Sequence, residues 1–243
     1  MDRWIGFGRS LLVYNNPISR RAWRLFYEDL LSPGDVAFDI GAHVGTRARA
    51  MRAVGARVVA IEPQEPFAKY LRRTLPGDIE VVAAAVGGHA GEREMAVSHR
   101  HPTVSSLQTE FVQRASSSPG FEKVQWNDSQ SVQMVTMDDL ISRYGKPHYV
   151  KIDVEGFESD VLKGLSEPVP LLSTEYLPGF GSLTHHVIDR LEELGEYFFK
   201  PVSGETGRFL WPEWRDAKAT REWLDSLSPE ARSGDLFARC ESL

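Results

Sequence analysis

The sequence has little cysteine, no surplus of positive charge and no long hydrophobic run. Cys240 is the only cysteine among 243 residues, which excludes an intramolecular disulfide and leaves no reason to expect an oxidising compartment. Lysine and arginine total 28 against 34 acidic residues, for a net charge of −6. Because clustered positive charge supplies most of the affinity for a phosphate backbone, we expect no nucleic-acid partner.

Apolar residues never accumulate into the stretch of roughly 18 that a transmembrane helix needs. The first 20 residues include Asp2, Arg3, Arg9 and Arg20 and do not have the pattern of a signal peptide. With 42% hydrophobic and 26% charged residues, the composition is that of a soluble globular protein. We therefore expect a cytoplasmic protein, and the sequence leaves its oligomeric state open, a homodimer included.

Strand-like and helix-like segments alternate after Pro33. Strands are expected at residues 36–40, 58–62, 79–85, 132–135, 148–154, 171–176, 197–202, 208–211 and 236–239. Helices are expected at residues 17–31, 46–54, 66–74, 157–165 and 183–194, with a further start capped by Thr136. This alternation implies parallel strands joined by right-handed crossovers. We expect an N-terminal helical extension at residues 1–32 and one α/β domain at residues 33–243.

The ends of the first two strands outline a nucleoside pocket. The first strand, in VAFDIGAHVG, contains Asp39 and leads into a turn in which Gly41 and Gly45 permit close backbone approach. The second strand ends in Glu62, where a carboxylate can accept hydrogen bonds from both ribose hydroxyls. Ligands of such sheets bind beyond the carboxyl ends of the strands, where both acids lie.

The spacing of the glycines separates this motif from the dinucleotide fingerprint Gly-x-Gly-x-x-Gly, because the middle glycine is missing. Asp39 would repel a pyrophosphate but suits a cationic ligand. S-adenosylmethionine carries an ammonium, a sulfonium and no phosphate, so it is the expected cofactor. An NAD dehydrogenase is disfavoured, and an ordinary strand-turn-helix with a capping aspartate is the structural alternative.

The segment KIDVEG, which begins at Lys151, places three ionisable groups at alternate positions of a strand that should be buried. Buried charges are costly unless paired, so we expect Lys151 to pair with Asp153 or with Asp39 on the neighbouring strand. Asp153 and Glu155 lie at the carboxyl end of the strand. Glu175 brings a third acid to the same rim from the end of the next strand.

With these motifs the sequence resembles the FkbM family of S-adenosylmethionine-dependent methyltransferases, which have the class I fold. The resemblance covers about residues 33–239, and its most specific part is KIDVEGFE at residues 151–158. The other matching segments are FDIGAHVG, AIEP, AAVG, VTMDDL and GDLFA. The resemblance implies a doubly wound, mostly parallel Rossmann-like sheet of about seven strands with helices on both faces. One departure is Ala83, where relatives often carry Asn or Asp.

The resemblance also implies a reaction class. Similar proteins typically methylate hydroxyl groups on sugars, glycolipids or other natural products, and related proteins include peptide carboxyl methyltransferases. A small-molecule or saccharide acceptor is therefore expected. By resemblance, Asp39, Gly41 and Gly45 hold the methionine end of the cofactor, Glu62 the ribose, and Asp153 faces the methyl group. The expected cofactor-binding residues are Asp39, Gly41, Ala42, His43, Gly45, Glu62, Pro63, Ala84 and Asp153.

Methyl transfer to an oxygen needs an aligned acceptor and a group that takes its proton. The candidate bases are Asp153, His43, Glu155 and Glu175, with Asp153 expected first and His43 second. The candidate acceptor contacts are Ser105, Ser106, His101, Glu158 and His185. Residues 103–120, rich in serine, threonine and glutamine, are a candidate lid.

Two other functions use the same residues. A metal-dependent glycosyltransferase would use Asp153 and Glu155 to bind the metal of a nucleotide sugar, but it leaves Asp39 and Gly41 unexplained. A non-catalytic S-adenosylmethionine-binding module would keep the pocket without turnover. We expect no metal, although Asp153, Glu155 and Glu175 offer the oxygen ligands that a divalent cation prefers.

Overall fold

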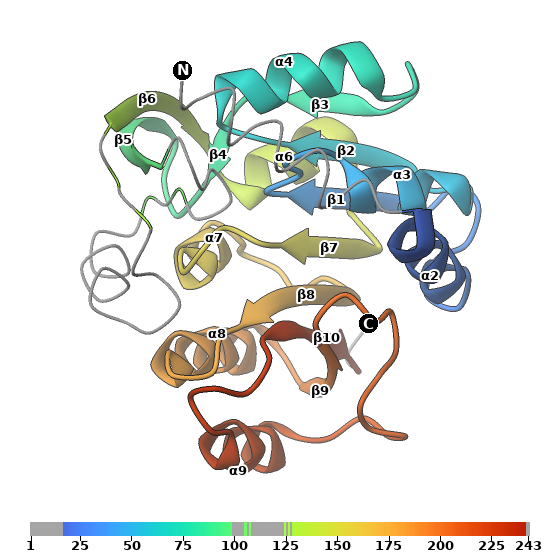
Figure 1. Ribbon diagram of the computed structural model, residues 1–243, viewed down its shortest axis with the longest axis vertical. Helices are drawn as coiled ribbons and strands as arrows, with labels where there is room; N and C mark the ends of the chain where they lie inside the picture. Colours follow the sequence, from blue (N-terminus) through green and yellow to red (C-terminus); the bar gives the residue numbers. More distant parts are fainter. Residues whose placement is uncertain are drawn as a thin grey trace.

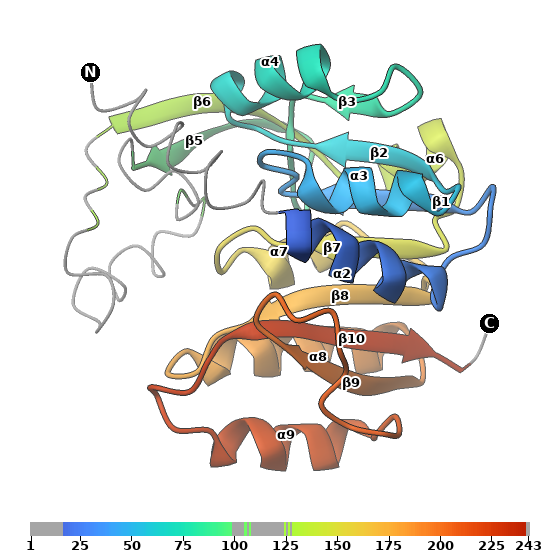
Figure 2. The same ribbon diagram turned by 45° about the vertical axis from the view of Figure 1, so that its right-hand side comes forward.

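The computed structural model of the chain describes residues 17–98, 105, 107, 124, 126 and 128–241, with the backbone only for residues 17–19. Seven strands form a large sheet between two layers of helices, and three more strands form a small sheet beyond the carboxyl ends of β1 and β7 (Figure 1, Figure 2). Within the described residues, no helix combines the length and the hydrophobicity that crossing a membrane requires.

The large sheet confirms the expected mostly parallel Rossmann-like fold. In spatial order its strands are β3 (Glu80–Val82), β2 (Arg57–Ile61), β1 (Val36–Ile40), β7 (Tyr149–Ile152), β8 (Leu171–Tyr176), β10 (Gly234–Cys240) and β9 (Tyr197–Ser203). Neighbours from β3 to β8 are parallel, whereas β10 is antiparallel to both β8 and β9. The carboxyl ends of the parallel strands therefore share one edge, where ligands bind in such sheets.

Helices cover both faces of this sheet. The helices are α2 (Pro17–Glu28), α3 (Thr46–Ala53), α4 (Glu65–Thr74), α6 (Met137–Tyr144), α7 (Glu158–Lys163), α8 (Gly181–Leu194) and α9 (Ala217–Ser226). Buried residues of α2, α3 and α4 pack on one face, and those of α6 to α9 pack on the other. The domain thus has the three-layer architecture that shields parallel strands from water on both sides.

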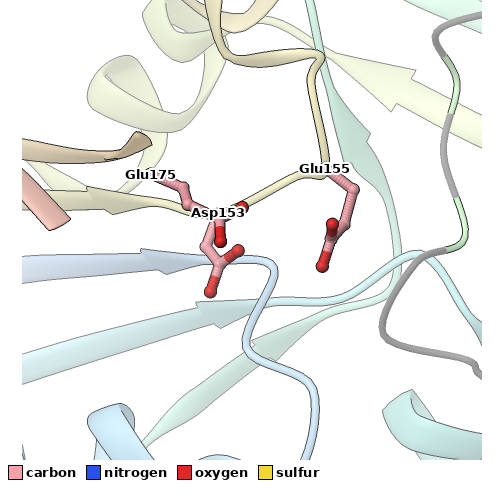
Figure 3. A group of neighbouring side chains, drawn as sticks. All are labelled: Asp153, Glu155 and Glu175. Carbon is pink, nitrogen blue, oxygen red and sulfur yellow. The ribbon is translucent and has the colours of Figure 1, made fainter. Parts of the chain in front are cut away.

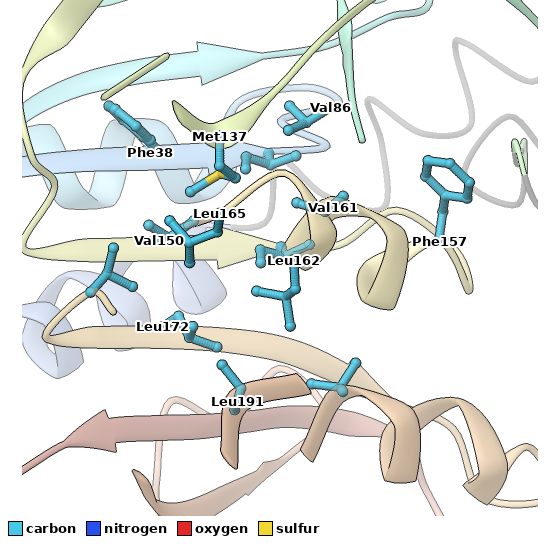
Figure 4. Close-up of a cluster of buried hydrophobic side chains, with 14 of the residues drawn as sticks. Phe38, Val86, Met137, Val150, Phe157, Val161, Leu162, Leu165, Leu172 and Leu191 are labelled. Atoms are coloured by element: carbon cyan, nitrogen blue, oxygen red, sulfur yellow. The ribbon is translucent and has the colours of Figure 1, made fainter. Parts of the chain in front are cut away.

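Side-chain alternation along the strands sorts residues between the two layers. Phe38 and Val150 are fully buried in the layer that also contains Leu162 and Leu191 (Figure 4). Ala37 of β1 and Tyr149 of β7 lie in the other layer, together with buried residues of α2 and α3. Burying each large apolar side chain contributes about 1.5–3 kcal/mol, so the two apolar layers hold the central strands in register.

Helix α2 supplies part of the apolar layer that lies on the same face of the sheet as α3 and α4. Trp23 and Tyr27 are fully buried and pack with Met51 of α3 and Tyr149 of β7. The described part of the segment expected as an N-terminal extension therefore packs on the sheet through these side chains of α2. The helix ends at Glu28, three residues before its expected end.

The small sheet was not expected. Its order is β4 (Ala85–Val86), β6 (Asp128–Val135) and β5 (Gly91–Val97). The strand expected at residues 79–85 is divided: β3 ends in the large sheet, and β4 pairs with β6 in the small one. The first four residues of β5 are exposed, so its sequence lacks the apolar pattern that would predict a strand.

Two further expectations differ from the structure. Residues 208–211 do not form a strand, because their only ladder contact is an isolated bridge between Phe209 and Val202. Helix α9 was not predicted, although Asp216 caps it by accepting a hydrogen bond from the Ala219 N–H. The cap at Thr136 is confirmed as a reciprocal capping box with Asp139.

Candidate functional site

A cavity of about 270 Å³ opens at the carboxyl ends of β1, β2 and β7. Its wall comes from the turn after β1, the tip of β2, the small sheet, the turn after β7, and Glu205 from the connection between β9 and β10. All of the residues expected to bind the cofactor line this cavity except Gly45. The structure therefore brings together both strand ends that the sequence singled out.

Two glycines shape the turn after β1. Gly41 has φ 79°, and a Cβ there would overlap the carbonyl oxygen of Asp153 at the end of β7. Gly45 has φ 76° and precedes α3, and a Cβ there would press on Leu71 of α4. Gly41 thus allows the turn to approach β7, while Gly45 positions α3 rather than lining the cavity.

Glu62 joins the turn after β1 to the segment that follows β2. It is 2% exposed, its Oε2 accepts the N–H of His43 at 2.9 Å, and its Oε1 accepts the N–H of Gln64 at 2.8 Å. Burial raises the pKa of Glu62 to about 7 despite these two hydrogen bonds, which favour the ionised form. The carboxyl group therefore titrates near neutrality at the cavity wall.

Lys151 lies between two carboxylates, as the alternate charges of its strand predicted. Its Nζ is 2.8 Å from Asp153 Oδ2 and 3.9 Å from Asp39 Oδ1, so it pairs with both expected partners. Burial raises the pKa of Asp39, and Lys151 only partly opposes this. Burial would also raise the pKa of Asp153, but the nearby ammonium outweighs it and brings this pKa below its usual value.

Asp153, Glu155 and Glu175 form an acidic cluster at the ends of β7 and β8 (Figure 3). One carboxylate oxygen from each lies within 4.8 Å of the others. Burial first, and then repulsion from neighbouring acids, raises the pKa of Glu155 and of Glu175 well above the usual value. Of the three, Asp153 and Glu155 line the cavity and Glu175 does not.

Glu158 holds the turn that presents Glu155. Its Oε1 accepts the N–H groups of Val154 and Gly156, both at 3.2 Å. Glu155 has φ 54°, a conformation that non-glycine residues rarely adopt. Glu158 is buried and does not line the cavity, so its contacts are with this turn rather than with a bound acceptor.

The other residues expected to contact the acceptor are spread over the chain. Ser105 lines the cavity, and its Oγ accepts the N–H of Ser98 at 3.2 Å. His185 does not line it; its Nε2 lies 2.8 Å from an oxygen of Asp225, joining α8 to α9. The remaining two candidates and most of the expected lid lie outside the described residues: His101, Ser106 and residues 103–120 apart from 105 and 107.

Arg47 and Glu205 line the cavity although sequence reasoning did not select them. The Arg47 guanidinium is buried, lies over the Trp23 indole, and donates to Asp235 of β10 at 2.8 Å. Glu205 in turn accepts the Trp23 Nε1–H at 2.7 Å. An arginine in the first turn of a helix gives no local signal of burial, so only the three-dimensional contacts reveal this group.

The family model for the methyltransferase FkbM domain matches residues 39–198. The chain belongs to the FkbM methyltransferase family. The matched region runs from Asp39 in β1 to the beginning of β9 and includes Glu62 and the acids that follow β7. The family assigned by resemblance in the sequence is therefore confirmed.

Among curated proteins, this FkbM-family chain is similar to the hexuronic acid methyltransferase AglP of Haloferax volcanii. The two are 26% identical over 137 residues, which cover 54% of this chain and 50% of AglP. The chain therefore spans about half the length of this curated relative.

Solved structures of other methyltransferases align with most of the chain. The TehB-like SAM-dependent methyltransferase of Corynebacterium glutamicum aligns with a TM-score of 0.49 and 10% identity over 96% of this chain and 94% of that one. The precorrin-6y C5,15-methyltransferase of Geobacter metallireducens aligns with a TM-score of 0.47 and 12% identity over 91% and 86%. Because both scores lie below 0.5, membership of the FkbM family rests on the family model.

Proposed function

We propose that this FkbM-family protein transfers the methyl group of S-adenosylmethionine to a hydroxyl oxygen of a saccharide, glycolipid or other natural product. The observation that carries the proposal is the single cavity that joins Asp39 and Glu62 to the acids following β7. The similarity to a protein named hexuronic acid methyltransferase supports a saccharide acceptor. Methylation of a carboxyl group is the second candidate, because a hexuronic acid carries both kinds of oxygen.

The residues of the cavity fit the proposed cofactor. Both carboxylate oxygens of Asp39 are buried without a well-formed hydrogen bond from a described residue, and their ionic partner Lys151 is 3.9 Å away. Burial outweighs the groups that favour the ionised form, so a ligand that donates to Asp39 stabilises it. An ammonium group meets that need. Glu62 is placed for the ribose, and the apolar side chains of Ala84, Ala85 and Met95 offer a surface for the adenine. When bound, S-adenosylmethionine supplies an electrophilic methyl group on a sulfonium.

Among the candidate bases, the charges of the site favour Glu155. A carboxylate whose pKa is held low, like that of Asp153 beside Lys151, is a weak proton acceptor. Burial lowers the pKa of His43 to about 4, which also makes it a weak base. Glu155 lines the cavity with a raised pKa. We propose that Glu155 takes the acceptor's proton, while Lys151 and Asp153 orient the groups around it.

A labelled-methyl experiment tests the proposed function. The protein is incubated with methyl-labelled S-adenosylmethionine and, separately, with free hexuronic acids, neutral hexoses and short peptides. We expect label in a saccharide fraction, and mild base treatment distinguishes an O-methyl ether, which persists, from a methyl ester, which is hydrolysed. Binding of S-adenosylhomocysteine without transfer to any acceptor would favour the non-catalytic module. Thermal stabilisation by a nucleotide sugar with a divalent metal, and not by S-adenosylhomocysteine, would favour the glycosyltransferase.

The affinity for S-adenosylhomocysteine is expected to rise about tenfold between pH 6 and pH 8, following ionisation of Glu62. Burial raises the pKa of this carboxyl group to about 7, so it is mostly protonated at the lower pH and mostly ionised at the higher one. Ribose hydroxyls donate more strongly to the ionised form, because charge-assisted hydrogen bonds are the stronger ones. Isothermal titration calorimetry at half-unit pH steps measures the change.

The control for this pH dependence is Glu62→Gln, which removes the titration and should give a weaker, pH-independent affinity. A wild-type affinity that stays constant across the range would contradict the assignment of Glu62 to the ribose. The raised pKa also affects stability: between pH 4.5 and 7 the folded protein binds a proton that the unfolded chain has released. Glu62 therefore lowers the free energy of unfolding as the pH rises through that window.

A further inference from the structure

The Arg47 guanidinium is locked in place on one side. Its Nη2 donates to Asp235 Oδ2 at 2.8 Å, and it lies 3.3 Å from Glu205 Oε2. The Trp23 indole covers its flat face and is itself held by Glu205. With the residue 7% exposed, the orientation of the guanidinium is set by groups from α2, β10 and the connection between β9 and β10.

The second terminal nitrogen of this guanidinium is without a hydrogen bond in the described part of the chain. Its Nη1 is buried and makes no hydrogen bond to any described residue, and Arg47 lines the cavity. A buried donor left unsatisfied costs about 1–3 kcal/mol, and more when it carries charge. This cost is relieved when a bound ligand places an oxygen at Nη1.

The charges around Arg47 indicate which kind of ligand oxygen would bind at its Nη1. The second cation of the cavity, Lys151, is already paired with Asp153 and Asp39. A planar guanidinium suits a carboxylate, whose two oxygens match its N–H groups. The acids lining the same cavity, including Asp39 and Glu62, disfavour a doubly charged phosphate, whereas a singly charged carboxylate that belongs to a zwitterion brings its own compensating cation.

We propose that Arg47 binds a carboxylate inside the cavity. The inference rests on the proposed function, which offers two sources: the amino-acid end of the cofactor or a carboxylated acceptor. The amino-acid end matches both charges of the site, because its ammonium suits the negative Asp39 and its carboxylate suits the positive Arg47. Arg47 also acts on Asp39 electrostatically, since it contributes to lowering the pKa of that carboxyl group against the effect of burial.

Calorimetry with two nucleosides tests the cofactor source. S-adenosylhomocysteine has the amino-acid end, and 5′-methylthioadenosine lacks it. We expect Arg47→Lys and Arg47→Met to weaken the binding of S-adenosylhomocysteine by roughly 10- to 100-fold, the effect of losing a charged hydrogen bond, and to leave 5′-methylthioadenosine within about twofold. Arg52→Met is the matched control, because Arg52 lies on the same helix, pairs with Asp78 at the surface and does not line the cavity.

Steady-state kinetics test the acceptor source. If the carboxylate belongs to the acceptor, the Arg47 variants bind both nucleosides normally, and KM rises roughly 10- to 100-fold for a hexuronic acid but not for the matching neutral hexose. The inference would be overturned if the Arg47 variants changed neither the ratio of the two nucleoside affinities nor the ratio of the two KM values. It would also be overturned if Arg47→Lys weakened the binding of both nucleosides equally, because Arg47 would then act by supporting the fold. A wild-type protein that binds neither nucleoside would overturn the proposed function itself.

Discussion

Replacing Glu155 with glutamine is expected to lower kcat by about 10²- to 10⁴-fold, the usual contribution of a general base. Glutamine has the same shape but cannot take a proton, so the affinity for S-adenosylhomocysteine should change little. The raised pKa of Glu155 further predicts that the wild-type rate increases with pH and that this increase is lost in the variant. Rapid-quench measurement of labelled methyl transfer from pH 6 to pH 9 provides both results.

The matched comparison is Asp153→Asn. Asp153 is paired with Lys151 at 2.8 Å, so its loss should disturb the charge balance of the cavity and affect cofactor affinity as well as kcat. A kcat loss in Asp153→Asn without one in Glu155→Gln would return the role of base to Asp153. Activity that disappears with a chelator and returns with a divalent cation would show metal dependence instead, for which Asp153, Glu155 and Glu175 are the candidate ligands.

Replacing Gly41 with alanine is expected to lower the free energy of unfolding by about 2 to 4 kcal/mol. Two effects combine: a non-glycine residue at φ 79° is strained, and the added Cβ overlaps the backbone carbonyl of Asp153, which is a form of overpacking. Since the overlap lies at the cavity wall, cofactor affinity should fall as well. Urea unfolding monitored by circular dichroism gives the change in free energy.

Two other glycines separate these effects. Gly34 has φ 93° with open space around it, so Gly34→Ala should show the conformational strain alone, about 1 kcal/mol. Gly77 has open space and no positive φ, so Gly77→Ala should be neutral or slightly stabilising. Equal losses in Gly34→Ala and Gly41→Ala would mean that the turn moves away from β7 at no cost.

The central part of the fold was predictable because its signals are local. β1 and β8 begin and end where the apolar runs predicted, and buried parallel strands consist of such runs. The small sheet was not predictable in the same way. β5 has an exposed, polar first half and pairs with β6 across a long intervening segment, so its pairing depends on the tertiary structure.

The candidate site likewise has residues that the sequence predicted and residues that it did not. Asp39, Glu62 and Asp153 were found because each lies at or near a strand end, and parallel strand ends meet at one edge. Arg47 was missed because its contact with Asp235 joins positions 188 residues apart. The preference for Glu155 over Asp153 as base likewise needed the distance from Lys151 to Asp153, which alternation along a strand suggests but does not measure.

Several contacts that hold the stretch from Lys151 to Glu158 in shape are made between its own residues. It supplies a buried cation, the acid paired with it, a second acid at the cavity, and the carboxylate that holds their turn. Because these contacts join residues no more than four positions apart, this turn is expected to keep its shape when distant parts of the chain are changed. The Arg47 group has no such independence, because it is assembled from four separate parts of the sequence, at Trp23, Arg47, Glu205 and Asp235.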